Sequence, residues 1–168
     1  MLKKKQKNSF KFSKGLLITI AAIAGISVLV GGFLINSFTA VNSDSLVFAP
    51  TTNVFLKALK SSQGYHYSTQ STKGSKTVPS AAGTSPSIVV SKGNLVQIHL
   101  INEEKNQPDM PSKHNLNIDE FNVHLKDLGY FQTDSVKFLA DKTGTFHYYC
   151  SVHPDMKGTI TVTDSLLN

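Results

Sequence analysis

The longest run of apolar residues lies near the N-terminus of the 168-residue chain. Residues 16–35 read LLITIAAIAGISVLVGGFLI, with no charged side chain and only Thr19 and Ser27 as polar ones. Twenty residues of α-helix rise about 30 Å, the thickness of the bilayer's hydrocarbon core. The run predicts a retained transmembrane anchor. A cleaved leader is the alternative, but its apolar region is usually about 7–15 residues followed by small residues spaced A-x-A, whereas residues 38–40 begin with phenylalanine.

The segment after the apolar run has a weaker pattern. Residues 36–64 start as a polar stretch and are predicted as a linker, in which VFLKAL (54–59) follows a candidate cap at Asn53 and suggests a short helix. Residues 64–70 suit a first strand. Residues 68–87 are rich in Ser, Thr, Gly and Pro without an apolar period, which predicts a loop.

From Ile88 onward, apolar and polar residues alternate in short segments, as in LVQIHLI (95–101). Gly-containing turns at 91–94 and 141–144 separate neighbouring segments. Short strands at such regular spacing indicate an antiparallel β-sandwich. Strands are predicted at residues 88–90, 95–101, 114–118, 135–139, 145–150 and 158–163.

The positive charge is concentrated before the apolar run. The formal net charge is +6, but six of the 17 basic residues, all lysines, lie in the first fourteen positions, and 11 lysines meet 11 acidic residues from position 15 onward. By the positive-inside rule, residues 1–15 are a basic cytoplasmic tail, and the remainder faces outward from a single-pass membrane protein. The outward part is neutral overall, which argues against nucleic-acid binding.

The candidate chemistry lies in TGTFHYYCSVHPDMKGTITV, residues 143–162. Cys150, His153 and Met156 stand three residues apart, between two predicted strands. Cys150 is the single cysteine, so an internal disulfide is excluded. A thiolate, an imidazole and a thioether on one loop form a soft site. With a second histidine, these side chains match the ligand set of blue-copper sites.

Three stretches resemble a known family: YYCSVHPDMKGTITV (148–162), HNLNIDE (114–120) and VVSKGNLVQIHLINEE (89–104). They are similar to the cupredoxins, and within that family to amicyanin and plastocyanin, over about residues 86–163. The Cys-x2-His-x2-Met loop looks like the short amicyanin loop. The resemblance implies an all-β Greek-key sandwich of the cupredoxin type over residues 65–168. The apolar run at 16–35 predicts one transmembrane helix before it.

The resemblance also implies roles for individual residues. His114, Cys150 and His153 would be the strong ligands of one type I copper ion, and Met156 the weak axial ligand. Asn115 would tie the two ligand loops together without binding the metal.

Electrons would pass through His153, in a surface patch with Val152 and Pro154. Tyr149, beside the cysteine, would be a second route, although a plain exposed tyrosine explains it equally well. The implied partner is a redox protein or a membrane oxidoreductase complex.

The sequence departs from the family pattern near the predicted ligands. Lys113 stands where relatives carry proline or an apolar residue, Val152 replaces a common proline, and Asn117 interrupts a predicted strand. These residues leave the ligand types unchanged. His124, in FNVHL, is the alternative to His114 as upstream ligand and is interpreted as a surface histidine, like His147 and His99.

The function predicted from these residues is one-electron transfer at the outer face of the cell membrane, without enzymatic activity. A copper-binding or delivery module is the alternative. A multicopper enzyme would carry histidines beside the cysteine, but Tyr149 and Ser151 flank Cys150. A binuclear copper centre would need a second cysteine. A metal-free adhesion sandwich would retain all four ligand types only by coincidence.

Overall fold

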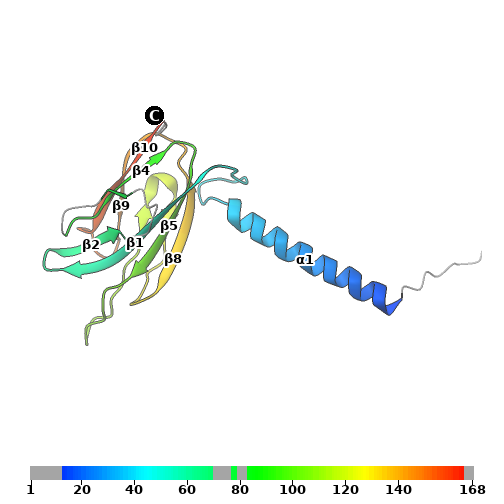
Figure 1. The fold of residues 1–168 in the computed structure, drawn as a ribbon. Helices are drawn as coiled ribbons and strands as arrows, with labels where there is room; N and C mark the ends of the chain where they lie inside the picture. The colour runs from blue at the N-terminus through cyan, green and yellow to red at the C-terminus, as the bar shows by residue number, and fades with distance from the viewer. Residues whose placement is uncertain (1–12, 70–76, 79–82, 165–168) are drawn as a thin grey trace, which may run out of the picture. The chain divides into compact units, whose positions relative to one another are not determined.

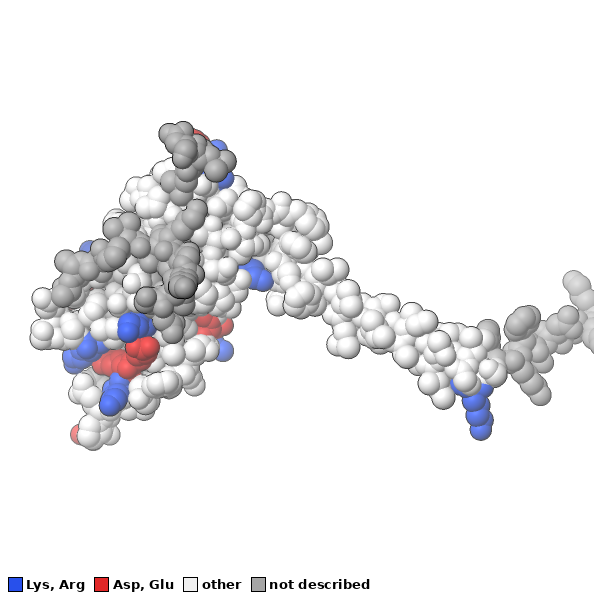
Figure 2. All heavy atoms as spheres, viewed as in Figure 1, with Lys and Arg blue, Asp and Glu red and all other residues white. Residues whose placement is uncertain are grey.

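The computed structural model describes residues 13–69, 77–78 and 83–164, and it divides into two units. The first holds most of α1 (Lys14–Phe38), a helix of 25 residues with no buried side chain. Its length and apolar composition suffice to cross a membrane, as the sequence predicts. On the face drawn in Figure 2, the only charged side chain along the helix lies at its N-terminal end.

The second unit is a β-sandwich of two sheets (Figure 1). The four-stranded sheet has the order β2-β1-β5-β8, and the six-stranded sheet has the order β3-β4-β10-β9-β6-β7. Strand β1 pairs in parallel with β5, and β10 pairs in parallel with β4. The other strand pairs are antiparallel. The strands are β1 (Thr51–Ser61), β2 (Gly64–Thr69), β3 (Thr77–Val78), β4 (Ser87–Ser91), β5 (Leu95–Asn102), β6 (Asn117–Ile118), β7 (Val123–His124), β8 (Thr133–Leu139), β9 (Gly144–Tyr149) and β10 (Lys157–Thr163).

Side chains of alternate residues from both sheets form one hydrophobic core. In β5, Val96, Ile98 and Leu100 are fully buried, while the residues between them are partly exposed. Tyr148 of β9 and Phe138 of β8 are among the largest buried side chains. The period-two pattern of the sequence therefore places the core correctly, because successive residues of a strand face opposite sides of a sheet.

Most predicted strands from Ile88 onward are confirmed, with ends that shift by one or two residues. The predicted strand 114–118 is shorter than expected, because only Asn117–Ile118 pair as β6 while His114 makes an isolated bridge to Leu128. In the segment predicted as a loop, β3 adds a short strand. Residues 70–76 and 79–82 of that segment lie outside the described residues.

The short helix predicted at 54–59 is wrong, because these residues lie in β1. Val54, Leu56 and Ala58 are buried, and the residues between them are partly exposed, which is the alternation of a strand. Backbone pairing with β2 on one side and β5 on the other stabilises the extended form. The sandwich therefore begins before residue 65.

Part of the predicted linker is docked onto the sandwich. The Val41 backbone N–H donates to the carbonyl of Lys137 at 2.8 Å. The side-chain amide of Asn42 donates to the Leu139 carbonyl at 2.8 Å and accepts from the Leu139 N–H at 2.7 Å. These bonds occupy backbone groups of the edge strand β8, so the segment covers an edge instead of forming a free tether.

Candidate metal centre

The loop between β9 and β10 carries three of the predicted site residues. Cys150 follows the last residue of β9 directly, and Met156 precedes the first residue of β10. The Cys150 N–H donates to the Met156 carbonyl at 3.0 Å, and the Met156 N–H donates to the His153 carbonyl at 2.9 Å. The loop is thus closed by its own backbone, which holds Cys150 and His153 at one end of the sandwich.

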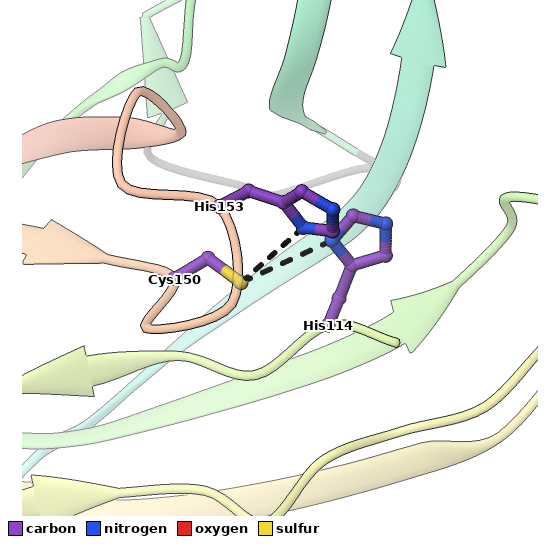
Figure 3. Close-up of side chains that lie close together, drawn as sticks. All are labelled: His114, Cys150 and His153. Atoms are coloured by element: carbon purple, nitrogen blue, oxygen red, sulfur yellow. Dashed lines mark hydrogen bonds between the residues drawn. The ribbon is translucent and has the colours of Figure 1, made fainter. Parts of the chain in front are cut away.

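His114 comes from a second loop, between β5 and β6, and lies close to Cys150 and His153 (Figure 3). Its Nδ1 lies 4.0 Å from the Cys150 sulfur, and Nδ1 of His153 lies 3.9 Å from the same atom. The three atoms lie within 4.8 Å of one another. Cys150 and His114 are fully buried, and His153 is partly exposed.

The two nitrogen–sulfur separations fit a metal ion bound to the thiolate and an imidazole. Bonds of about 2.0 Å to nitrogen and 2.3 Å to sulfur, at a trigonal angle, place nitrogen and sulfur about 3.7 Å apart. Two imidazoles and one thiolate favour copper or zinc among the common metals. Met156 is fully buried in the same loop, and its thioether as a weak axial ligand stays a prediction.

Glu104 orients the imidazole of His114. The carboxylate oxygen lies 2.7 Å from Nε2 of His114, and the Glu104 side chain is only 9% exposed. With a metal ion bound through Nδ1, the proton of the imidazole would lie on Nε2 and be donated to Glu104. Burial alone would lower the pKa of His114, but hydrogen bonds to the Cys150 and Glu104 side chains raise this pKa above its ordinary value.

The end of β5 and the loop after it hold Glu104 in place. The Glu104 N–H donates to the side chain of Asn102 at 2.9 Å, and the Ser112 hydroxyl donates to the Glu104 carboxylate at 3.2 Å. The Asn102 amide donates to the Ser112 hydroxyl and to the Leu128 carbonyl, both at 2.8 Å. The carboxylate therefore belongs to a buried polar network and has little freedom to leave His114.

Asn115 connects the two ligand loops. Its amide oxygen accepts from the Ser151 N–H at 2.8 Å, while its amide nitrogen donates to the Ser151 hydroxyl at 2.6 Å and to Asp127 at 2.8 Å. The Tyr67 hydroxyl donates to the Asn115 carbonyl. Asn117, buried in β6, donates its side-chain amide to the Asn115 oxygen at 3.0 Å. Asn117, the polar residue in the predicted strand 114–118, thus supports the link that Asn115 makes between the two loops.

The surroundings of Cys150 favour the thiolate. Burial alone would raise the pKa of Cys150, but hydrogen bonds from the His114 side chain and from the backbone of Asn115, His153 and Val152 lower it below the ordinary value. Because a thiolate, not a thiol, binds metals, this shift prepares the sulfur for a metal ion.

The structure distinguishes between the two candidate upstream histidines. His124 has an exposed side chain, and its Nδ1 lies 3.2 Å from the Asn117 side chain. Among the described residues, His114, Cys150 and His153 form the group that could bind a metal, and His124 is outside it. His147 is exposed as predicted, whereas His99 is half-buried and stacked on Phe55.

The other predicted surface residues surround the loop. Val152 and Pro154 are exposed beside His153. Tyr149 is partly exposed, and its hydroxyl donates to the two carboxylate oxygens of Asp119 at 3.0 and 3.1 Å. The hydrogen bond to Asp119 raises the pKa of Tyr149 above its ordinary value.

Glu104 and Tyr65 also contact the ligand histidines, and sequence reasoning assigned a role to neither. Tyr65 stacks on His153 with ring centroids 3.8 Å apart. Tyr65 lies in β2, within the strand expected at residues 64–70. No local pattern indicated Glu104, because it lies beyond a strand end and ten residues from His114.

Comparison with known proteins identifies the fold family. A model of the cupredoxin-like domain matches residues 52–162. The chain belongs to the cupredoxin family. Members of this family are in general one-electron copper carriers, and the match includes β1, which the sequence analysis had placed outside the cupredoxin domain.

Solved cupredoxins resemble the chain at low sequence identity. A copper nitrite reductase from Nitrosomonas europaea is 24% identical, with 67% of this chain and 41% of that chain covered and a TM-score of 0.48. Auracyanin from the photosynthetic bacterium Roseiflexus castenholzii is 18% identical, with 68% and 99% covered and a TM-score of 0.44. This chain thus spans less than half the length of the nitrite reductase. No match was found among curated proteins.

Proposed function

We propose that this cupredoxin is a membrane-anchored carrier that takes up and passes on one electron at a single type I copper ion. The observation that carries the proposal is the convergence of His114 Nδ1, Cys150 Sγ and His153 Nδ1 within 4.8 Å of one another. A bound copper ion would supply the redox change, and Met156 is proposed as its weak axial ligand.

The chain's contribution is to hold its ligands in one arrangement. The backbone bonds within the Cys150–Met156 loop and the Asn115 side chain link the groups that would bind copper. Electron transfer is fast only when little atomic movement accompanies it, so a preformed ligand set suits a carrier.

Partner docking is proposed at the surface around His153. Exposed apolar side chains lie on the loops near the centre, among them Met110 (57% exposed) and Val152 (39% exposed). Phe131 (65% exposed) follows Leu128, whose backbone pairs with that of His114. Such a surface suits brief contact with another redox protein or a membrane oxidoreductase complex. On the face drawn in Figure 2, lysines lie next to acidic residues, which fits the neutral charge of this unit.

The membrane location is also part of the proposal. The 25-residue helix α1 would cross the bilayer once, with the lysine-rich N-terminus in the cytoplasm and the sandwich outside. The anchor would raise the local concentration of the carrier near membrane partners. The docked residues 41–42 give the sandwich less reach than a free linker would.

Spectroscopy of the full chain in lipid nanodiscs tests the copper assignment. After loading with one equivalent of copper(II), we expect an intense visible absorption from thiolate-to-copper charge transfer and the narrow copper hyperfine splitting of a type I site in the paramagnetic-resonance spectrum. A spectrum without the charge-transfer band would overturn the assignment.

Redox cycling distinguishes a carrier from a delivery module. A carrier retains copper through repeated reduction and oxidation in the presence of a copper(I) chelator, whereas a delivery module loses copper on reduction. We also expect no turnover of nitrite, because a single site flanked by Tyr149 and Ser151 lacks a connection to a second copper.

A further inference from the structure

The two ligand imidazoles are oriented by different kinds of contact. His114 donates through Nε2 to the buried carboxylate of Glu104 at 2.7 Å. In the part of the chain that the structure describes, no hydrogen bond holds Nε2 of His153, which is partly exposed. An imidazole fixed only through its metal-binding nitrogen can rotate about its side-chain bonds, so another contact must orient His153.

Tyr65 supplies that contact. Its ring stacks on the imidazole of His153 with centroids 3.8 Å apart and an angle of 26° between the planes. The same ring lies 5.7 Å from the His114 imidazole. Tyr65 and His153 also line a small hollow of about 40 Å³ together with Met110. The tyrosine thus covers one face of the exposed ligand.

The position of Tyr65 is determined by the strand that carries it. Tyr65 belongs to the edge strand β2 and pairs across the ladder with Lys60 of β1. The Lys60 ammonium lies 4.9 Å from the centre of the Tyr65 ring. Two residues further along the same face, the Tyr67 hydroxyl donates to the Asn115 carbonyl. Strand β2 therefore contacts both ligand loops, His153 through Tyr65 and Asn115 through Tyr67.

We propose that Tyr65 is the positioning residue of His153, holding its imidazole in the metal-binding orientation by ring stacking. The inference rests on the proposed copper function, which it deepens by assigning the support of the exposed ligand. Stacking acts on the face of the partly exposed His153 ring and does not occupy Nε2, whereas a hydrogen-bonded carboxylate like that of Glu104 would. The carboxylate contact therefore suits the buried ligand His114, and the stacking contact suits the partly exposed ligand His153.

The test compares three variants of the full chain in nanodiscs. Tyr65→Leu removes the aromatic ring, and Tyr65→Phe retains it without the hydroxyl. Phe55→Leu is the matched control, because Phe55 also stacks on a histidine, His99, at 4.5 Å and 8° but outside the centre. Two quantities are measured: copper release from the reduced protein to a chelator, and the nuclear-magnetic-resonance shifts and ring contacts of His153 in the copper-free chain.

We expect Tyr65→Leu to release copper about 2- to 12-fold faster, the factor that corresponds to the free energy of one aromatic pair. In the copper-free chain, His153 ring protons should lose their ring-current shift and their nuclear Overhauser contact to residue 65. Tyr65→Phe should match the wild type in both measurements, and Phe55→Leu should leave them unchanged.

Two results would overturn the inference. One is an unchanged release rate and unchanged His153 shifts in Tyr65→Leu. The other is equal acceleration by Phe55→Leu, which would indicate general loosening of the sandwich. Failure of the copper function is a separate result, because it would appear as a missing charge-transfer band in the wild type, whereas the copper-free resonance measurement still decides the role of Tyr65.

Discussion

The Glu104 carboxylate lies 2.7 Å from Nε2 of His114, a histidine ten residues further along the chain. The carboxylate makes the imidazole a stronger electron donor, which would favour copper(II) over copper(I) at the proposed site. Glu104→Gln should therefore weaken copper(II) binding about 10- to 100-fold. If copper(I) binding is unchanged, the reduction potential rises by about 60 to 120 mV. Voltammetry of the copper-loaded protein measures the change.

The neighbouring glutamate provides the control for this prediction. Glu103 pairs with Lys57 at 3.2 Å on the surface, and both side chains are about one-third exposed. Glu103→Gln should leave the potential within about 10 mV of the wild type, because exposed ion pairs contribute little. Equal shifts in the two variants would show that net charge, and not the contact with His114, sets the potential.

Replacing His114 and replacing His124 should have different effects on the copper spectrum. His114→Ala and Cys150→Ala should each abolish the visible charge-transfer band, because each removes an atom that lies about 4 Å from its neighbour in the centre. His124→Ala should retain the band, since its exposed ring lies outside the group. Absorption after copper loading is the measurement, and the reverse pattern would make His124 the ligand.

Asn115 should contribute to stability independently of the metal. Asn115→Ala removes its side-chain bonds to Ser151 and Asp127, and the side-chain amide of the buried Asn117 loses Asn115 as its acceptor. The expected loss in unfolding free energy of the copper-free protein is about 2–3 kcal/mol, measured by urea denaturation. Asn53→Ala, which removes an exposed amide near His99, should cost less than about 0.5 kcal/mol. Similar losses would refute a connecting role for Asn115.

The Tyr149–Asp119 contact predicts a pH effect. The Tyr149 hydroxyl donates to the Asp119 carboxylate, and ionisation would break that bond and place two negative charges together. The pKa of Tyr149 is therefore raised above its ordinary value of 10.0. Asp119→Asn should lower this pKa toward 10.0, so that Tyr149 ionises at lower pH. Carbon nuclear magnetic resonance of the isotope-labelled Tyr149 ring, recorded as a function of pH, measures the change. An unchanged titration midpoint in Asp119→Asn would contradict the prediction.

The structure leaves no room for a side chain at Gly158, two residues after Met156 of the ligand loop. Gly158 pairs with Tyr148 across β9 and β10, and a Cβ at this position would collide with the Tyr148 ring. The buried Tyr148 hydroxyl donates to the Pro86 carbonyl at 2.6 Å, so the ring has little room to move. Gly158→Ala should destabilise the protein by about 1–3 kcal/mol in thermal or urea unfolding. Gly129→Ala, where a Cβ meets only ordinary contacts, is the control, and equal losses would contradict the collision.

Sequence reasoning was reliable where local spacing determines structure. Alternation in residues 95–101 predicted β5 and its buried face, because the pleat of a strand repeats every two residues. The three-residue spacing of Cys150, His153 and Met156 placed these side chains on one loop. The same kind of reasoning failed at residues 54–59. There the buried positions of β1 also suited a short helix, and only pairing with β2 and β5 decides between the two.

The sequence by itself determined the apolar helix, most of the sandwich strands and the ligand types of the candidate centre. Only the tertiary structure decided that His114 and not His124 meets Cys150, that Glu104 and Tyr65 contact the two imidazoles, and that residues 41–42 dock on β8. The physical reason is the range of the interactions. Periodicity and spacing act between near neighbours in the chain, whereas these contacts join loops and strand edges that come together only when the two sheets pack.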